Sequence, residues 1–442
     1  MRVAIVGSGI SGLAVAHRLV EHARVTLFEA ADYFGGHTHT VDITLSVDGR
    51  PVRHGVDTGF LVFNERTYPT LIALFAELEI ATCRSDMSFS VQSADPDSGR
   101  HLEWSGTSLR SVFSQTRNLF SPRFLGMLGD LSRFNRLTQS IAAAGQERDL
   151  QQSLGDFLRQ HRFGGPFIDW YFLPMVACIW SCPKQQMLQF PVATMIRFCH
   201  NHGLNQVSDR PQWWTVRGGA RHYVDKIVAR VVDKRLQTPV LAIERHGDMG
   251  GVTIRTAHGS EHFDRVVLAT HSDQALALLQ DASAAERATL GAVRYHPNHA
   301  VLHTDTSVLP RNPRAWAAWN YASARAKSMG PGASEHAVCL HYLINRLQPL
   351  PWQQPVLVSL NPLREIRAEH ILGEYRYAHP VFDRAAIAAQ PRVEQLQGQR
   401  STYFCGAWMG YGFHEDGLKA GLSVAHRVLA DIDQRATRLV AA

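Results

Sequence analysis

Residues 1–30 read MRVAIVGSGISGLAVAHRLVEHARVTLFEA, and this stretch decides the fold. Residues 2–6 form a short apolar run, typical of a strand that is buried on both faces of a parallel sheet. Glycines follow with the spacing G-x-G-x-x-G, and a helical pattern runs from about residue 11 to residue 21. A second strand, residues 24–28, ends at Glu29. This order predicts an α/β fold that begins with a Rossmann-type dinucleotide site.

Each part of this motif has a physical role at a dinucleotide. Gly7 allows the tight turn, Gly9 lets the backbone approach a pyrophosphate, and Gly12 lets helix and strand pack closely. The free N–H groups and the dipole of the helix start favour a diphosphate, and Glu29 can accept hydrogen bonds from a ribose. The alternative is a glycine-rich turn in an unrelated α/β domain. The predicted contacts are Gly7, Gly9, Ile10, Ser11, Gly12, Glu29 and Ala30.

Length and composition set outer limits on the kind of protein. The 442 residues suggest two domains, and the apolar fraction of 45% is that of a globular protein. The net charge is +6, but no dense Lys/Arg block indicates nucleic acid as a partner. An ordinary basic surface and a patch that contacts a membrane surface remain alternatives. The sequence does not determine the oligomeric state.

Cysteine usage and hydropathy indicate the compartment. The six cysteines form neither a C-x-x-C pair nor a disulfide framework, which favours a reducing environment. The apolar N-terminus lacks the charged region and cleavage site of a signal peptide, and no run of about 18 apolar residues is present to span a bilayer. We therefore expect a cytoplasmic protein, with peripheral contact to a membrane left open.

A Gly-Gly pair, Gly35 and Gly36, follows the ribose acid. This arrangement resembles flavoproteins of the monoamine oxidase, protoporphyrinogen oxidase and phytoene desaturase group. That family often has arginine on both sides of the pair, whereas Phe34 and His37 stand there in this chain. The resemblance implies FAD as the cofactor, with His37 and Thr38 beside it. His37 and His39 alternate along the chain, but without further ligands at suitable spacing no metal site is predicted.

Three further stretches resemble cofactor-binding parts of the same family. Residues 53–63 resemble the D-x-G turn beneath the flavin, with a plain turn as the alternative for Asp57. Residues 213–272 resemble the return to the cofactor domain, where a valine backbone pairs with adenine. Residues 403–421 resemble the final strand, glycine loop and helix, whose N-terminus faces the flavin; the family's acidic residue is replaced by Ala407. The implied contacts are Asp57, Thr58, Gly59, Phe60, Val240, Ala269, Thr270, Gly406, Ala407, Glu415, Asp416 and Gly417.

Because these signals lie at both ends and in the middle of the chain, we expect a Rossmann-type FAD-binding domain built from discontinuous segments. It comprises residues 1–79, 206–285 and 392–442. Residues 80–205 and 286–391 then form an α+β substrate domain with a mixed sheet and a helical insert. The insert carries an aromatic and Met-rich stripe at residues 167–180, which indicates either core or a hydrophobic substrate cavity.

The catalytic residues are predicted from two strands of the substrate domain. Residues 295–305 align with the strand that carries a lysine near flavin N5 in amine oxidases, and His299 falls at that position. On the aromatic strand 316–321, Asn320 and Tyr321 are candidates for positioning the substrate, with core packing as the alternative. A structural role is likewise the alternative for His299.

The resemblance implies an FAD-dependent oxidoreductase of the oxidase or desaturase type. It would pass a hydride from a C–H bond of a hydrophobic substrate, such as an unsaturated lipid or isoprenoid, to flavin N5. One alternative is an FAD-dependent isomerase acting on such a substrate. Another is a non-catalytic binding module, similar to the dissociation inhibitors of prenylated GTPases; the intact glycine triad argues against it.

Overall fold

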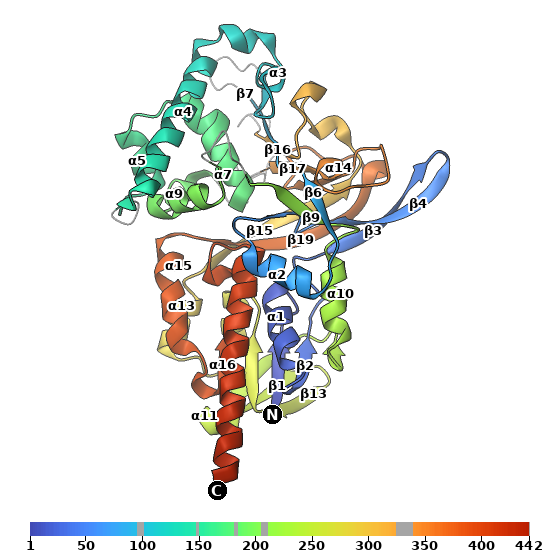
Figure 1. Cartoon of the computed structure of the whole chain (residues 1–442), viewed down its shortest axis with the longest axis vertical. Helices are drawn as coiled ribbons and strands as arrows, with labels where there is room; N and C mark the ends of the chain where they lie inside the picture. Colours follow the sequence, from blue (N-terminus) through green and yellow to red (C-terminus); the bar gives the residue numbers. More distant parts are fainter. Residues whose placement is uncertain (95–100, 147–149, 181–183, 205–210, 324–338, 442) are drawn as a thin grey trace.

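The computed structural model describes residues 1–94, 101–146, 150–180, 184–204, 211–323 and 339–441. The chain forms two stacked parts, each built on a sheet (Figure 1). The N-terminal strand and the long C-terminal helix lie in the same part. No helix in the described residues is long and apolar enough to cross a membrane.

The first sheet is parallel and joins segments that are far apart in the sequence. Its five strands, in spatial order, are β10 (Asp233–Arg235), β2 (Arg24–Phe28), β1 (Arg2–Val6), β14 (Arg265–Leu268) and β20 (Thr402–Phe404). Strand β1 is almost fully buried because it lies in the middle with helices on its faces. The strand predicted at residues 2–6 is therefore confirmed, as is the strand at 24–28.

Two helices pack against each other beside this sheet, α1 (Ile10–Leu19) and α16 (His414–Ala441). Their close approach needs small residues: a Cβ on Gly417 would lie 2.8 Å from Cγ2 of Ile10 and 3.0 Å from Oγ of Ser11. Helix α2 (Pro69–Glu77) contacts α16, and helix α10 (Arg221–Ala229) contacts α1. The two ends of the chain are thus held together in one domain.

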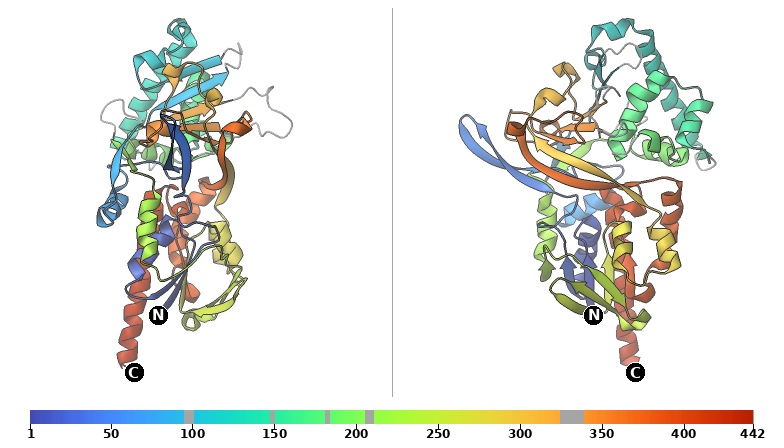
Figure 2. Two further views of the ribbon diagram at one scale, coloured as in Figure 1. Left: turned by 90° about the vertical axis from the view of Figure 1, so that its right-hand side faces the viewer. Right: turned by 180° about the vertical axis from the view of Figure 1, so that it is seen from behind.

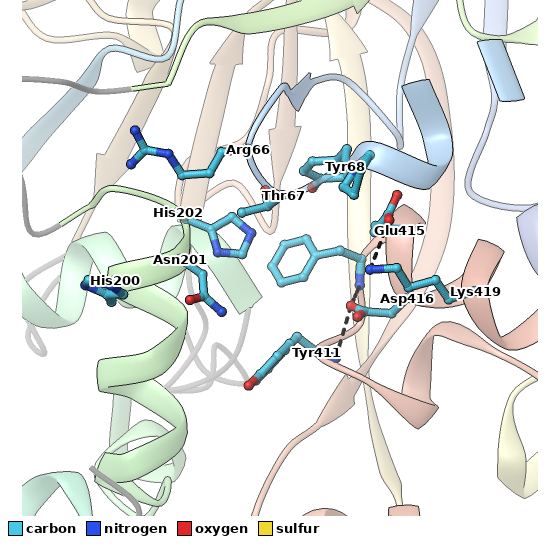
Figure 3. Close-up of a pocket in the computed structure, with 12 residues that line it drawn as sticks. Arg66, Thr67, Tyr68, His200, Asn201, His202, Tyr411, Glu415, Asp416 and Lys419 are labelled. Atoms are coloured by element: carbon cyan, nitrogen blue, oxygen red, sulfur yellow. Dashed lines mark hydrogen bonds and ion pairs between the residues drawn. The ribbon is translucent and has the colours of Figure 1, made fainter. Parts of the chain in front are cut away.

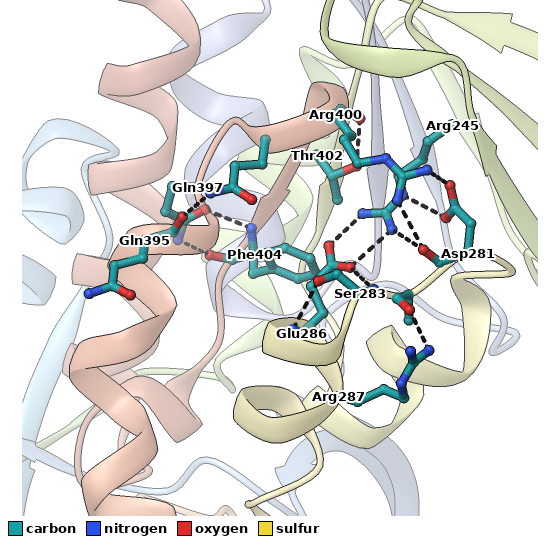
Figure 4. Close-up of polar contacts among 12 residues, drawn as sticks. Arg245, Asp281, Ser283, Glu286, Arg287, Gln395, Gln397, Arg400, Thr402 and Phe404 are labelled. Atoms are coloured by element: carbon teal, nitrogen blue, oxygen red, sulfur yellow. Dashed lines mark hydrogen bonds and ion pairs between the residues drawn. The ribbon is translucent and has the colours of Figure 1, made fainter.

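An antiparallel sheet lies beside this domain, formed by β11 (Ala242–Arg245), β12 (Val252–Thr256) and β13 (Gly259–Phe263). Arg245 is fully buried and its Nε donates to Asp281 at 2.8 Å, while Nη2 donates to Glu286 at 3.0 Å (Figure 4). This ion-pair network fixes β11 to α13 (Ala284–Leu290). Nearby, the side-chain amide of Gln397 donates to the C=O of Phe404 and accepts from its N–H. These two bonds satisfy backbone groups on the edge of β20 that has no neighbouring strand in the described residues.

The second large sheet is mixed and belongs to the upper part of Figure 1. Its strands, in spatial order, are β19 (Ile371–Val381), β15 (Arg294–His303), β18 (Leu357–Leu360), β17 (Cys339–Leu343), β16 (Trp319–Ala322), β7 (Phe89–Ala94) and β8 (His101–Ser105). A hairpin of β3 (Thr40–Val47) and β4 (Arg50–Asp57) projects from the molecule (Figure 2). A small sheet of β5 (Phe63–Asn64), β9 (Trp213–Val216) and β6 (Thr82–Ser85) lies between the two parts.

A group of helices covers one side of the mixed sheet (Figure 2). They are α3 (Leu109–Val112), α4 (Pro122–Ala143), α5 (Leu154–Gln160), α6 (Gly165–Phe167), α7 (Leu173–Trp180), α8 (Lys184–Met187) and α9 (Val192–Asn201). Residues Ile168–Phe172 form a π-helical turn that leads into α7. Phe167, Trp170 and Phe172 are buried in one apolar cluster, so most of the stripe predicted at 167–180 is core.

Two short helices connect strands within one sheet, α11 (Gly247–Gly250) and α14 (Ile344–Leu347), while α12 (Ser272–Leu278) and α15 (Arg384–Ala389) lie in connections between the two large sheets. The fold class is confirmed as a Rossmann-type α/β domain with a second, mixed-sheet domain carrying a helical insert. The predicted β segments near residues 87–103 are an antiparallel pair, and most of the turn predicted between them, residues 95–100, lies outside the described residues. The exact domain boundaries stay a prediction.

Candidate functional site

A cavity of about 700 Å³ runs from the glycine motif of the first sheet to the mixed sheet of the second domain. One end is walled by the loop after β1, the Gly35–Gly36 pair and the loop after β20. The other end is walled by side chains of β16, β17, β18 and β19. The two domains therefore share one continuous space.

The glycine end of the cavity is shaped to receive a diphosphate. Gly9 is the N-cap of α1 and gives it no side-chain cap, so the first N–H groups of the helix remain for a ligand. A Cβ built on Gly9 would meet nothing within 4 Å, while one on Gly36 would lie 3.1 Å from Cα of Gly9. Gly7 has φ of +100°, which favours glycine. The residues present fit the pyrophosphate of FAD.

Glu29 lines the cavity and also joins the two loops beside it. Its Oε2 accepts from the Ser8 amide at 2.9 Å and from Ser8 Oγ at 2.6 Å, and its Oε1 accepts from the Ala31 amide at 2.9 Å. Ser8 Oγ in turn accepts from the Gly35 amide at 3.1 Å. The acid thus ties the first glycine motif to the Gly-Gly pair, and its predicted contact to the ribose stays a prediction.

His37 is half-buried in the cavity wall, and its Nε2, itself a buried atom, has no hydrogen-bond partner among the described residues. Burial lowers the pKa of His37 to about 4, with His271 acting in the same direction and a hydrogen bond to the Ala378 backbone opposing it. An orphaned ring nitrogen in a wall is costly unless a ligand contacts it. This position, where the family often has arginine, is therefore suited to a polar group of the cofactor.

Further imidazoles surround His37, with ring centroids 6.2 Å away for His271 and 5.5 Å away for His379. Burial lowers the pKa of His271 to about 4 and that of His379 to about 3, so both rings are neutral at pH 7. The amide of Asn298 donates to Nδ1 of His379 at 2.9 Å, which leaves the ring proton on Nε2. The middle of the cavity is polar but uncharged.

The far end of the cavity is apolar. Its lining side chains are Met87, Ile179, Phe198, Leu204, Trp213, Trp319, Tyr342 and Leu360. The indole Nε1 of Trp319 is buried without a partner in the described residues. Among the described residues that line the cavity, Glu29 is the sole carboxylate, and it lies at the other end. A hydrophobic, uncharged molecule fits this end.

The structure brings most of the predicted cofactor contacts together around the cavity. Its lining includes Gly7, Gly9, Ile10, Ser11, Glu29, Ala30, Gly35, Gly36, His37, Thr58, Gly59, Phe60, Val240, Ala269, Thr270, Gly406 and Ala407. Other predicted contacts lie behind the wall: Gly12, Thr38, Asp57, Glu415, Asp416 and Gly417. For these six, the structure shows supporting contacts, and their contact with the cofactor stays a prediction.

The supporting roles follow from their hydrogen bonds and packing. Asp57 is buried, and both carboxylate oxygens accept from the Ala220 amide at 3.0 Å, which fixes the start of α10. Burial raises the pKa of Asp57 to about 6. Glu415 accepts from the amides of Thr70 and Leu71 and so caps α2. Thr38 Oγ1 lies 2.8 Å from Nε2 of His414, which lines the cavity.

Asp416 and the remaining glycines act in the same indirect way. Asp416 Oδ2 accepts from the amides of Tyr411 and Phe413, both at 3.0 Å, which shapes the loop before α16. Gly12 lies close to the carbonyl of Gly7 and so allows the tight turn at β1. Gly417 allows α16 to approach α1, as described above.

The three predicted catalytic residues are not in the cavity wall. His299 is half-exposed and its Nε2 lies 2.8 Å from Glu374, an ion pair when the ring is protonated. Asn320 is buried and its amide bonds Ala317 and the carbonyl of His341 across the sheet, so it is structural. Tyr321 packs among apolar side chains of the helical insert. Their catalytic role therefore stays a prediction without support from this cavity, and on β15 it is Tyr295 that lines the wall.

Several wall residues were missed from the sequence. They are His271, Tyr295, Tyr377, His379, Trp408 and His414. The hydroxyl oxygen of Tyr377 lies within hydrogen-bond distance of two groups, Oγ1 of Thr58 at 2.7 Å and Nδ1 of His39 at 3.1 Å. The alternation of Tyr377 and His379 along β19 is a signal that could have indicated a shared face.

A second cavity, of about 530 Å³, adjoins the first beside the start of α2 (Figure 3). Tyr68, His202 and Phe413 line both cavities and so form the partition between them. Its wall includes Glu415 and Asp416, whose carboxylates make the hydrogen bonds described above. In the described part of the chain, no group of three or more His, Cys, Asp or Glu side chains is arranged to hold a metal ion.

Comparison with known proteins identifies the family. Residues 10–313 match the family described as flavin containing amine oxidoreductase, and the chain belongs to it. No curated protein matches the chain. Membership of this family makes the protein an FAD-dependent oxidoreductase of the amine oxidase superfamily, with FAD as its cofactor.

Solved structures show the same fold at low sequence identity. Putrescine oxidase bound to putrescine has a TM-score of 0.65 at 15% identity, over 97% of this chain and 99% of that one. A fatty acid isomerase from P. acnes that produces CLA has a TM-score of 0.63 at 16% identity, over 96% and 98%. Cyclohexylamine oxidase from Brevibacterium oxydans IH-35A has 0.62 at 16%, over 98% and 99%. At these identities the likeness shows the fold alone.

Proposed function

We propose that the enzyme oxidises an uncharged, hydrophobic substrate at a C–H bond, as an unsaturated lipid or isoprenoid would present. The single observation that carries this proposal is the distribution of charge in the cavity. In the described lining, the side chains from the mixed sheet are apolar, aromatic or, at His379, a neutral imidazole, and none of them is a carboxylate. An ammonium substrate would be desolvated there without a counter-ion, which is costly.

Bound FAD supplies the hydride acceptor. Gly7, Gly9 and the start of α1 would hold its diphosphate, and Val240 lies in the wall next to the same loops. Apolar side chains such as Leu360 exclude water and orient the substrate chain.

A matched pair of probes tests the charge argument. Methyl linoleate and linoleylamine share one apolar chain and differ in the charge of the head. Binding to the FAD-loaded protein is measured by the change in flavin absorbance. We expect the ester to bind at least about tenfold more tightly, because the amine must lose its charge or its hydration. Tighter binding of the amine would contradict the proposal.

An FAD-dependent isomerase is the second candidate, since the same cavity suits an unsaturated chain. The fold likeness to a fatty acid isomerase is compatible with it. The two are separated by the flavin spectrum after anaerobic mixing. Net loss of the oxidised band supports oxidation, whereas an isomerised product with an unchanged spectrum supports isomerisation.

A further inference from the structure

The far end of the helical insert carries an unusual group of exposed apolar side chains. Leu109 is 79% exposed, Phe120 is 84% exposed, and Leu119 and Leu125 are 44% and 46% exposed. They belong to α3, to the 3-10 turn Thr116–Phe120 and to the start of α4, at the opposite end of the molecule from the C-terminus (Figure 1). We call these four side chains the apical patch. Isolated surface leucines need no explanation, but four exposed apolar side chains on three consecutive elements are a candidate interaction site.

The packing beneath the apical patch shows why these residues face outward. Phe113 and Phe124 lie with ring centroids 6.0 Å apart, and Phe124 also packs against Trp104 in the apolar core of the insert. In α4, Phe124 and Met127 are buried, so Leu125 points away from the core. The segment is thus anchored by one set of apolar residues while a second set remains in solvent.

The charged residues of the segment that carries the apical patch are all arginines. Between Glu103 and Asp130 the sequence contains three arginines, at 110, 117 and 123, and no Asp, Glu or Lys. Arg311 and Arg314 are exposed beside α3. Arg117 and Arg311 line a shallow depression whose one described carboxylate, Glu103, is buried.

Glu103 is bonded to backbone amides and to His101, not to the arginine side chains. Its carboxylate accepts from the amides of Arg311 at 2.8 Å and Asn312 at 3.1 Å, and it lies 2.8 Å from Nε2 of His101. These bonds hold the pKa of Glu103 below its usual range despite burial. The acid therefore orders the loop that carries Arg311.

We propose that the apical patch docks on the surface of a bilayer that contains anionic lipid. Exposed Leu and Phe side chains can enter the interface while arginines contact lipid phosphates, as in other peripheral membrane proteins. The positive charge of the arginines near the apical patch favours an anionic membrane over a neutral one. This inference does not depend on the substrate or on the redox reaction.

The test is cosedimentation of the full-length, FAD-loaded protein with vesicles. One set contains phosphatidylglycerol and phosphatidylcholine, and the other contains phosphatidylcholine alone. We expect binding to the first set, falling by at least about tenfold on the second or in high salt. In Leu109→Ser/Phe120→Ser, binding to anionic vesicles should fall by about tenfold or more.

Matched controls separate the surface from general effects. Val232→Ser/Leu241→Ser removes two exposed apolar side chains from the other domain and should bind as the wild type does. Arg110→Gln/Arg314→Gln should weaken binding by about 25-fold, since each arginine near an anionic surface contributes roughly fivefold, whereas Arg24→Gln/Arg255→Gln should leave it within about twofold.

Several results would overturn the proposal. One is wild-type protein that stays in the supernatant with anionic vesicles. Another is equal binding by the wild type and Leu109→Ser/Phe120→Ser. A third is a dimer, measured by sedimentation velocity without lipid, that the same double variant dissociates; the apical patch would then be covered by a second copy of the chain. Flavin content and spectrum are recorded for every variant. A loss of vesicle binding can therefore be distinguished from a failure of the proposed function.

Discussion

Gly36 lies against Gly9, so that a Cβ on Gly36 would be 3.1 Å from Cα of Gly9. This contact joins the Gly-Gly pair to the first glycine motif, although Gly36 stands 27 positions after Gly9 in the sequence. Neither glycine is required by the fold of its own segment alone. The contact brings two backbone segments together at the end of the cavity that fits the diphosphate.

The first prediction concerns this contact. Gly36→Ala adds a Cβ at φ of +58° and pushes the pair away from Gly9. We expect the dissociation constant for FAD to rise by about tenfold or more, for a loss of roughly 1–2 kcal/mol. Gly49→Ala is the matched control, because it has φ of +78° but nothing within 4 Å. FAD titration followed by flavin fluorescence checks both; an equal effect in the two variants would show that the contact does not matter.

The second prediction concerns Glu415, which caps α2. Glu415→Gln keeps the shape but removes the charge that interacts with the helix start, so the free energy of unfolding should fall by about 1–2 kcal/mol. The dissociation constant for FAD should change by less than about threefold. Glu394→Gln, at a surface ion pair, is the control and should change stability little. Loss of FAD affinity without loss of stability would instead place Glu415 at the cofactor.

The third prediction concerns Arg245, which is buried and paired with Asp281 and Glu286. Arg245→Met leaves these carboxylates without their cation, and we expect a loss of about 3–5 kcal/mol in the free energy of unfolding. Arg18→Met removes a surface pair with Glu77 and should cost less than about 1 kcal/mol. Urea unfolding measures both. Similar losses in the two variants would contradict the structural role of the buried network.

The fourth prediction is a loss of stability in acid. The folded pKa values of His37, His271, His379 and His414 lie at about 3 to 4, below the ordinary value of 6.5. Below pH 6.5 the unfolded chain therefore binds more protons than the folded protein, and stability falls as the pH falls.

Two carboxyl groups act in the opposite direction. Asp57 and Asp416 have pKa values raised to about 6 by burial, so the folded protein gains protons there first. Because the cavity histidines outnumber them, we expect a net loss on the order of 3 kcal/mol between pH 7 and pH 5. In His37→Gln the free energy of unfolding should depend less steeply on pH, by the equivalent of about one bound proton. A stability that is flat or rises toward pH 5 would contradict the neutral state of these rings.

The sequence alone was sufficient where the signal is local. The run at residues 2–6, the glycine spacing and Glu29 belong to one continuous unit, so strand, helix and strand were predicted at nearly the observed bounds. Glu415 shows the limit. Its place at the start of a helix was predicted, but its carboxylate bonds α2, which lies more than 300 residues away in the sequence.

Strand register explains why His299, predicted from the sequence to face the flavin, does not line the cavity. Strand β15 is ten residues long and pairs with β19 and β18, so its position relative to the cavity depends on contacts between distant strands. Tyr295, near its start, reaches the cavity, whereas His299, four residues further on, pairs with Glu374 on β19. A resemblance between sequences does not define this register.

Anaerobic mixing of the FAD-loaded enzyme with methyl linoleate or linoleylamine, followed by the flavin spectrum and product analysis, tests the central claim most directly. The account predicts that methyl linoleate removes the oxidised flavin band and yields a product with two fewer hydrogens, while linoleylamine does not. Reduction by the amine with formation of the aldehyde, or an unchanged spectrum with both probes, would contradict the account.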